Sequence, residues 1–363
     1  MKRMDSYIFG LLTETFLFGI IAFTSIFSGV GIIPNLVREA SSYGISFPVA
    51  LSLFAARLPQ VMVYTFPMAI LLSSLQVFSG LSSNNEITAF RSAGVNLIRI
   101  VAPALLFGLM ISLLTMFFSE SLVPKANLYV EYSIAKAKNE FSPMIRTAVN
   151  IPQYEDGQLK RTVNASKMYK DIMEDVTVTE FDNGYLERVV FAATANFVAG
   201  QGWVFNNGIL YMFNKKADTL TRILFEQELI NMKISPTDIN IIIDKSNADQ
   251  LSFRQLKAQI EKKEKTGQNI LKMQVELYAK TALPFACLIF MLLGAPLGLN
   301  PQRKSNAVGI GFSLLIIMLY YILMALGEWL GIVNILHPIM AAWLPNTLVG
   351  ILGIFLLLQK SKQ

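Results

Sequence analysis

The chain has 363 residues, of which 53% are hydrophobic and only 15% are charged, and its mean hydropathy is +0.47. Soluble domains carry about 25% charged residues, so this composition indicates an integral membrane protein. A single cysteine and a single histidine exclude a disulfide framework and the usual zinc sites. The basic excess of +6 is spread beside apolar segments instead of forming one cluster, which argues against binding of nucleic acid.

Six apolar segments are long enough, or nearly so, to cross a bilayer as helices, which takes about 20 residues. We predict spans at roughly 13–34, 58–80, 97–120, 275–297, 306–331 and 338–359. The first segment is long and lacks a small-residue cleavage site, so we interpret it as an uncleaved anchor.

The basic residues beside the short loops predict the orientation of these spans. One side of the membrane would carry Lys2, Arg3, Arg91, Arg99, Arg303, Lys304, Lys360 and Lys362, and the other only Arg38 and Arg57. By the positive-inside rule both termini are cytoplasmic, as an even number of spans requires. The long segment 121–273 then faces away from the cytoplasm.

The segment 121–273 changes from helical to extended patterning. "DVTVTEF" alternates, "DNG" is a strong hairpin signal, and "YLERVVFAATANFV" continues the extended pattern. The Asn and Gly residues of "GQGWVFNNGILYMF" predict a strand, a turn and a second strand. We therefore expect an antiparallel β domain of the sandwich or jelly-roll type.

Charged helices are predicted on both sides of these strands, in "ANLYVEYSIAKAKNE" and in "SFRQLKAQIEKKEKTG", which would end at Gly267. The predicted fold class is an α-helical membrane protein with six transmembrane helices and an inserted antiparallel β-jelly-roll domain. Its three parts are a membrane module at 1–120, the β domain with flanking helices at 121–273, and a second membrane module at 274–363.

A short polar stretch, "SNNEITAFRSAG", separates the second and third spans. Ser83 and Glu86 fit a capping box and Gly94 fits a stop signal, which predicts a helix at 83–94 with Ile87 and Phe90 on its apolar face. Two readings stay open from the residues alone. The helix only turns the chain around, with Glu86 as its cap, or a cytoplasmic partner grips it.

The motifs that would give the chain its own chemistry are missing from the sequence. There is no G-x-x-x-x-G-K-[ST] loop for ATP and no G-x-S-x-G nucleophile elbow. The main ionisable residues within the spans, Glu14, Lys280 and Glu328, lie near span ends, which disfavours an ion-coupled carrier.

Four blocks of the sequence resemble the LptF/LptG permeases, also called the YjgP/YjgQ family: "LPQVMVYTFPMAILLSSLQVFSGLSSNNEITAFRSAGV", "GWVFNNGILYMF", "KTALPFACLIFMLLGAPLGL" and "AAWLPN". The resemblance covers essentially the whole chain. It implies a permease subunit of an ATP-driven exporter that extracts lipopolysaccharide from the outer leaflet of the inner membrane and passes it to a periplasmic β-jelly-roll bridge. The implied partners are a second permease subunit of the same family and a cytoplasmic ABC ATPase dimer, which would use the ATP and Mg²⁺, so this chain binds no cofactor itself. Whether the chain is the F-like or the G-like subunit stays open.

The resemblance also suggests site residues. The family's coupling helix falls on Ser83–Gly94, its acidic residue on Glu86 and a basic position on Arg91, so the expected coupling set is Ser83, Glu86, Ile87, Phe90 and Arg91. The family gathers lipid in a cavity between its two subunits, gated by the first and fifth spans.

Candidate lipid contacts lie in two places. Arg38, Arg57 and Lys280 suit the phosphates of lipid A, or are snorkelling anchors. Phe191, Phe205 and Phe213 are candidates for contact with acyl chains in the β domain, although alternation does not say which face is interior.

Two rival functions remain from the sequence: an ion-coupled lipid carrier, and a membrane-anchored receptor or scaffold whose β domain binds a periplasmic partner.

Overall fold

The computed structural model describes residues 2–137, 145–155, 158–169, 171–182, 184–198, 202–214, 219–230, 232, 236, 248–265, 267–299 and 306–362. The chain divides into two compact units. The membrane unit comprises Met1–Ser133, Ala248–Phe253 and Leu271–Gln363, and the β unit comprises Ile134–Asn247 and Arg254–Ile270.

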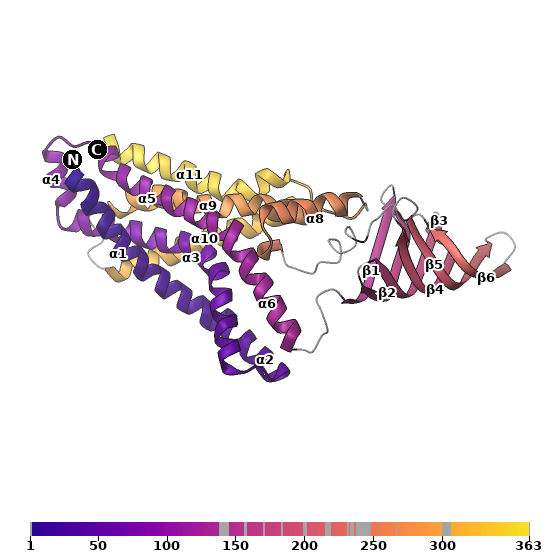
Figure 1. Ribbon diagram of the computed structural model, residues 1–363. Helices are drawn as coiled ribbons and strands as arrows, with labels where there is room; N and C mark the ends of the chain where they lie inside the picture. Colours follow the sequence, from indigo (N-terminus) through magenta and orange to yellow (C-terminus); the bar gives the residue numbers. More distant parts are fainter. Residues whose placement is uncertain are drawn as a thin grey trace. The chain divides into compact units, whose positions relative to one another are not determined.

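Six helical stretches among the described residues are long and apolar enough to cross a membrane. The first runs through α1 (Lys2–Phe27), a π-helical turn (Ser28–Ile32) and α2 (Ile33–Tyr43); the second is α3 (Phe47–Ser83); the third runs through α5 (Leu97–Phe117), a π-helical turn (Phe118–Leu122) and α6 (Val123–Ala137). The last three are α9 (Leu271–Gly298), α10 (Asn306–Ile332) and α11 (Pro338–Lys362). The short α4 (Glu86–Ser92) joins α3 to α5, and it lies at the same end of the membrane unit as both termini (Figure 1).

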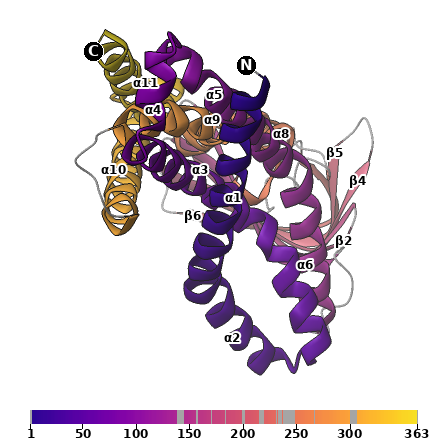
Figure 2. The ribbon, with the colours of Figure 1, turned by 90° about the vertical axis from the view of Figure 1, so that its left-hand side faces the viewer.

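Helix α3 forms the centre of the membrane unit. In its most apolar stretch 78% of residues are buried, and it packs against α1, α9 and α10, with α1 and α10 on different sides (Figure 2). A Cβ on Gly294 of α9 would lie 2.7 Å from the side chain of Ser74, whose hydroxyl donates to the Met291 carbonyl at 3.3 Å. Such close contacts between small residues hold membrane helices together, because lipid provides no hydrophobic force between them.

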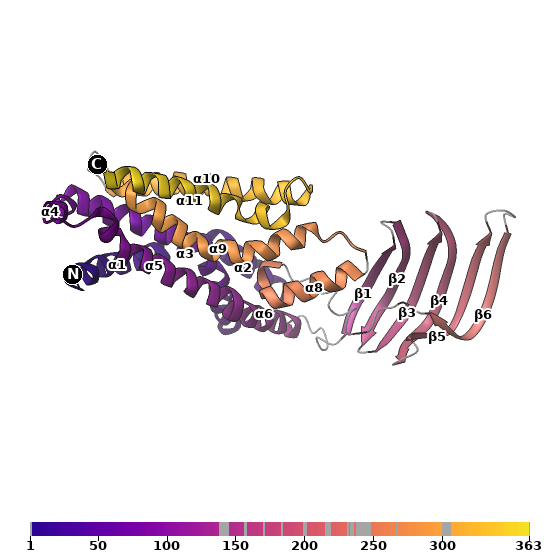
Figure 3. The same cartoon turned by 90° about the horizontal axis from the view of Figure 1, so that it is seen from above.

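The β unit contains six strands: β1 (Ile145–Glu155), β2 (Gln158–Tyr169), β3 (Ile172–Asp182), β4 (Tyr185–Val198), β5 (Gly202–Asn214) and β6 (Thr219–Ile230). They form one antiparallel sheet in the order β1-β2-β3-β4-β5-β6 (Figure 3). Asp182 pairs with Tyr185 across a two-residue turn, which confirms the hairpin predicted at "DNG". Later in the chain lie a short 3₁₀ turn (Ala248–Gln250), which belongs to the membrane unit, and α8 (Phe253–Lys265), followed by Gly267 at a φ of +68°. The six spans and the inserted antiparallel sheet confirm the predicted fold class.

The turn predicted inside "GQGWVFNNGILYMF" is wrong, because β5 is one continuous strand. Asn207 adopts a φ of +50°, as Asp175 does in β3, and both residue types tolerate this left-handed conformation. They belong to a row that the hydrogen-bonded register skips, at Ser166, Asp175, Ala193, Asn207 and Glu226. The residue pairs on both sides of this row keep the same register, so no extra residue is inserted in any strand. We call this row the crease of the sheet.

The crease reverses the alternation of side chains. In β2, β3, β4 and β5 the buried residues that flank it are three positions apart instead of two, as with Ala192 and Ala195. Buried side chains from both sides of the crease form one hydrophobic core, which includes Val163, Val178, Val190, Met173 and Phe205. The crease divides the sheet into two parts. We call the part that contains Val178 the long half and the part that contains Met173 the short half.

Candidate functional site

The segment between the second and third spans differs from its prediction at its start. Helix α3 continues to Ser83, whose hydroxyl donates to the Gly80 carbonyl at 3.0 Å. Asn85 precedes α4 in a left-handed conformation and makes no side-chain cap. The capping box of Ser83 and Glu86 is therefore wrong, because Ser83 still belongs to the preceding helix. Helix α4 begins at Glu86 and has seven residues instead of the nearly three turns expected from 83–94.

The predicted end of this helix is confirmed. Gly94 has a φ of +82°, its N–H donates to the Arg91 carbonyl at 2.9 Å, and the Val95 N–H donates to the Phe90 carbonyl at 3.0 Å. These two bonds have the pattern with which glycine commonly closes a helix.

The side chains of α4 divide between the core and the surface. Ile87 is 7% exposed and belongs to the core of the membrane unit, and the half-buried Phe90 packs against the same core. Glu86 is half-buried and Arg91 is exposed. Helix α4 thus packs on the core of the membrane unit through Ile87 and Phe90.

Two polar contacts tie this region to α1. The Tyr7 side chain on α1 interacts with the Glu86 carboxylate. Arg99, at the start of α5, donates to Asp5 Oδ2 at 2.7 Å. No local sequence pattern links Tyr7 or Asp5 to this region, because the residues are so far apart in the chain.

The three basic residues predicted to meet phosphates lie on three different helices. Arg57 on α3 donates to both carboxylate oxygens of Glu39 on α2, at 2.9 and 2.7 Å, so its charge is compensated within the chain. Arg38 on α2 is exposed and donates to Asn35 Oδ1 of the same helix at 2.8 Å. Lys280 on α9 is half-buried.

The three phenylalanines of the β unit lie on different faces. Phe205 is completely buried in the core that also contains Val190 and Ala192. Phe191 and Phe213 are 46% and 38% exposed on the opposite face, where the Phe191 ring lies edge-on to Tyr211 at 6.0 Å. The face of Phe205 is therefore the interior of this sheet.

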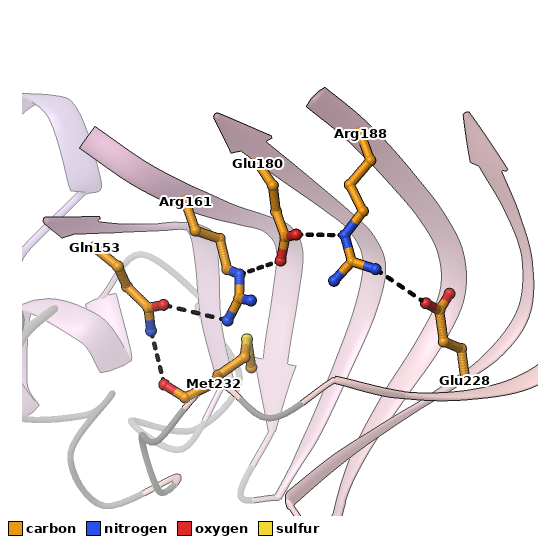
Figure 4. A network of polar contacts seen from close by, with 6 residues as sticks. All are labelled: Gln153, Arg161, Glu180, Arg188, Glu228 and Met232. Carbon is orange, nitrogen blue, oxygen red and sulfur yellow. Dashed lines mark hydrogen bonds and ion pairs between the residues drawn. The ribbon is translucent and has the colours of Figure 1, made fainter. Parts of the chain in front are cut away.

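A row of polar residues crosses the interior of the long half. The sheet register aligns Gln153, Arg161, Glu180 and Arg188 on four successive strands. Glu180 accepts hydrogen bonds from both arginines, and Arg161 also donates to Gln153 Oε1 at 3.5 Å (Figure 4). Arg188 forms a further ion pair with Glu228 of β6, in which the closest N and O atoms are 3.6 Å apart. We call these five residues the charged row.

Glu180 is only 8% exposed, so its ionised form depends on its neighbours. Burial acts to raise the pKa of this carboxyl, but the hydrogen bonds and positive charges of Arg188 and Arg161 outweigh it, and the pKa lies below its usual range. The hydrogen bond to Glu180 in turn raises the pKa of Arg188. The alternation of "DVTVTEF" already placed Glu180 on the same face as Val176 and Val178, but it gave no partner for the charge.

Comparison with known proteins identifies the family. No curated protein matches the chain. The family model for the lipopolysaccharide export system permease LptF/LptG matches residues 6–359, nearly the whole chain. The match agrees with the six membrane helices and the inserted antiparallel sheet, and the chain therefore belongs to the LptF/LptG family of lipopolysaccharide export permeases, which are multi-pass inner-membrane transport proteins and not enzymes.

Proposed function

We propose that this chain is one permease subunit of an ATP-driven exporter that extracts lipopolysaccharide from the outer leaflet of the inner membrane and passes it to a periplasmic β-jelly-roll bridge. Its partners would be a second LptF/LptG-type subunit and a cytoplasmic ABC ATPase dimer. ATP and Mg²⁺ are bound by the ATPase, and this chain binds no cofactor. The observation that carries the proposal is α4, a short helix between two spans with a carboxylate at its start and its apolar side in the membrane core.

In the proposed orientation both termini and α4 are cytoplasmic and the β unit is periplasmic. The basic residues beside the spans support it, because Lys2, Arg91, Arg99 and Lys360 lie at or near the end of the membrane unit that carries α4. One contact also places the C-terminal end of α11 beside α4: Ser361 Oγ lies 3.4 Å from Oδ1 of Asn96, in the loop that follows α4.

Helix α4 would act as the contact with the ATPase. Its exposed side presents Arg91 and part of the Glu86 carboxylate, and its buried side inserts Ile87 and Phe90 into the core. When the ATPase dimer closes on ATP, it would move α4 with it. The ion pair between Arg99 and Asp5 and the interaction of Tyr7 with Glu86 would pass that movement to α1.

Helices α1 and α10 would border the lipid cavity together with the second subunit. They are the least buried of the six spans, with 28% and 22% of their most apolar stretches buried. Large apolar side chains cover their free faces, among them Phe18 at 58% and Ile21 at 69% exposure on α1 and Met318 at 56% on α10. A lipid or a partner subunit must cover such a surface.

We propose lipid contacts in the membrane unit, with its phosphates, and in the β unit, with its acyl chains. Arg38 is exposed and suits a phosphate group, whereas Arg57 must first release Glu39 and Lys280 is half-buried. The acyl chains would enter the interior of the creased sheet, next to Phe205. Phe191 and Phe213 lie on the outer face and would not contact them.

Replacement of Glu86 by Ala tests the coupling role. We expect loss of the ATPase from the purified complex or loss of ATP-dependent lipid release from liposomes, because a charge-assisted contact of about 1.5–3 kcal/mol disappears. Thr88→Ala, an exposed change on the same helix, is the matched control. Normal ATPase binding and lipid release in the Glu86→Ala protein would remove Glu86 from the coupling role. Purification of an active complex without any ATPase would favour the ion-coupled carrier, and the absence of transport would favour the receptor.

A further inference from the structure

The charged row ends in a contact that a flat sheet could not make. The register places Arg188 opposite Met212 and Thr221, and it places Glu228 opposite Phe205 and Ala195. On β4, Ala195 lies seven residues beyond Arg188, which corresponds to about 20 Å along an extended strand. The Arg188 and Glu228 side chains are nevertheless 3.6 Å apart.

The crease explains how the two residues meet. Arg188 belongs to the long half of the sheet and Glu228 to the short half, on the other side of the row at Asn207 and Glu226. Figure 4 shows the strands curving around the charged row, with Glu228 facing Arg188. The ion pair therefore joins the two halves of the sheet across the interior.

A second contact closes the same end of the interior. Gln153 Nε2, on the edge strand β1, donates to the Met232 carbonyl at 2.9 Å, just beyond the end of the other edge strand β6. Ile230 and Met232 are 2% and 3% exposed and belong to the core of the β unit. The contacts of the charged row thus connect edge strand β1 with edge strand β6. The hydrogen bond to the Met232 carbonyl connects the segment after β6 back to Gln153 on β1.

The charged contacts between the two halves contribute little net stability, so they can break when the interior opens. Glu228 Oε2 is buried and has no hydrogen-bond partner among the described residues, so Glu228 meets its partner with only part of its carboxylate. Charged pairs that are partly buried recover little more than the cost of removing them from water, unlike apolar packing of the same size. Edge strand β6 also has apolar residues on its outside, including Leu224 at 72% and Leu229 at 57% exposure.

We infer that the ion pair between Arg188 and Glu228, supported by Arg161 and Glu180, is a latch that holds the two halves of the sheet closed, and that an acyl chain enters the interior when this latch opens along the crease. The inference rests on the proposed function, since it assumes that lipid passes through the β unit. In this inference β6 is the strand that moves, and Arg188 restrains it through Glu228.

The first experiment measures the opening itself, without lipid. Glu228→Gln in the full chain, within the purified complex, should speed amide hydrogen exchange in β6 and in its partner β5 on the order of tenfold, which corresponds to about 1.4 kcal/mol. Arg222→Gln removes a charge from an exposed position on the same strand, away from the crease, and should leave exchange unchanged. Equal exchange in the two variants would overturn the latch.

The second experiment adds lipopolysaccharide. A photocrosslinker at Phe205, or at the less tightly enclosed Leu210, should react with the lipid several-fold more in Glu228→Gln than in the unchanged chain when ATP is absent. A crosslinker at Phe191 on the outer face is the control. Faster exchange without a gain in crosslinking would overturn the role of the latch in lipid entry. Failure to crosslink at any interior position during ATP turnover would instead contradict the proposed lipid path.

Discussion

The two units of the chain place their charged residues in opposite ways. In the membrane unit the ion pairs lie near the ends of helices, as with Asp5 and Arg99 or Glu39 and Arg57. The contacts in the middle of its helices are apolar or join uncharged polar groups. Ser73 Oγ donates to the Leu12 carbonyl at 3.0 Å, and the Tyr320 hydroxyl donates to Asn346 Oδ1 at 2.9 Å. In the β unit the carboxylate of Glu180 lies inside, between two arginines.

This difference indicates which part of each unit can move. Helices held by close backbone contact have few alternative arrangements, so α3 and α9 would move as one body. The interior of the β unit, which is closed by a charged row, has an alternative open arrangement, because each charged group can exchange its partner for water at modest cost. The membrane unit would therefore transmit displacement and the β unit would open.

The largest expected effect comes from removal of all six strands of the β unit. Removal of residues 140–250 should leave a membrane unit that inserts and still hydrolyses ATP with its partner, because α4 is untouched. Delivery of lipopolysaccharide to a periplasmic acceptor should fall to background. The measurement compares ATP hydrolysis and delivery in the same proteoliposomes. Undiminished delivery would show that the β unit is dispensable and that its receiving role is wrong.

The next effect tests the rigid contact between α3 and α9. Gly294→Ala should destabilise the membrane unit by about 1–3 kcal/mol, because its Cβ would come within 2.7 Å of Ser74. Gly10→Ala, where no atom lies within 4 Å, is the matched control and should have little effect. Thermal unfolding of the detergent-solubilised complex measures both. If the two variants unfold at the same temperature, α3 and α9 are not held by close packing.

The sequence predicts the six spans but underestimates their lengths. The first helical stretch covers Arg3–Tyr43, whereas its apolar core predicted 13–34. Hydropathy reports the part of a helix that can lie in hydrocarbon, and the helix continues beyond it at both ends. The extended patterns likewise predict β3 and β4, and the turn residues predict the hairpin at Gly184.

The crease and the start of α4 could not be predicted, for a shared physical reason. Asn and Gly favour positive φ angles wherever the chain needs them, so "NNG" is equally compatible with a turn and with the crease at Asn207. The S-x-x-E pattern at Ser83 is likewise compatible with a cap and with the end of a longer helix. Only the pairing of whole strands and the packing of α3 decide between these alternatives. The same holds for the contacts of Tyr7 with Glu86 and of Arg188 with Glu228, which join distant segments.

A smaller effect tests the transmission from α4 to α1. Tyr7→Phe removes the hydroxyl that interacts with Glu86 and keeps the ring, so it should weaken the link by about 0.5–1.5 kcal/mol. We expect ATP hydrolysis to continue while the amount of lipid released per ATP falls severalfold. Tyr132→Phe, at an exposed position on α6, is the control. An unchanged ratio of release to hydrolysis would show that α1 is driven through other contacts.

The smallest effect concerns pH and the charged row. The folded-state pKa of Glu180 is lowered, so its ionisation stabilises the β unit fully above the usual carboxyl range, and this contribution is lost as the pH falls through the lowered value. Arg161 and Arg188 are the cationic residues that face Glu180, and Glu228 is the other carboxylate of the row. Hydrogen exchange in β3 and β4, corrected for its intrinsic pH dependence, should therefore not change between pH 7 and about 5, and it should accelerate only below about pH 4. In Glu180→Gln this acceleration should be absent, because the neutral amide has no proton to gain. Loosening that begins near pH 6 would assign the sensitivity to a group outside the charged row.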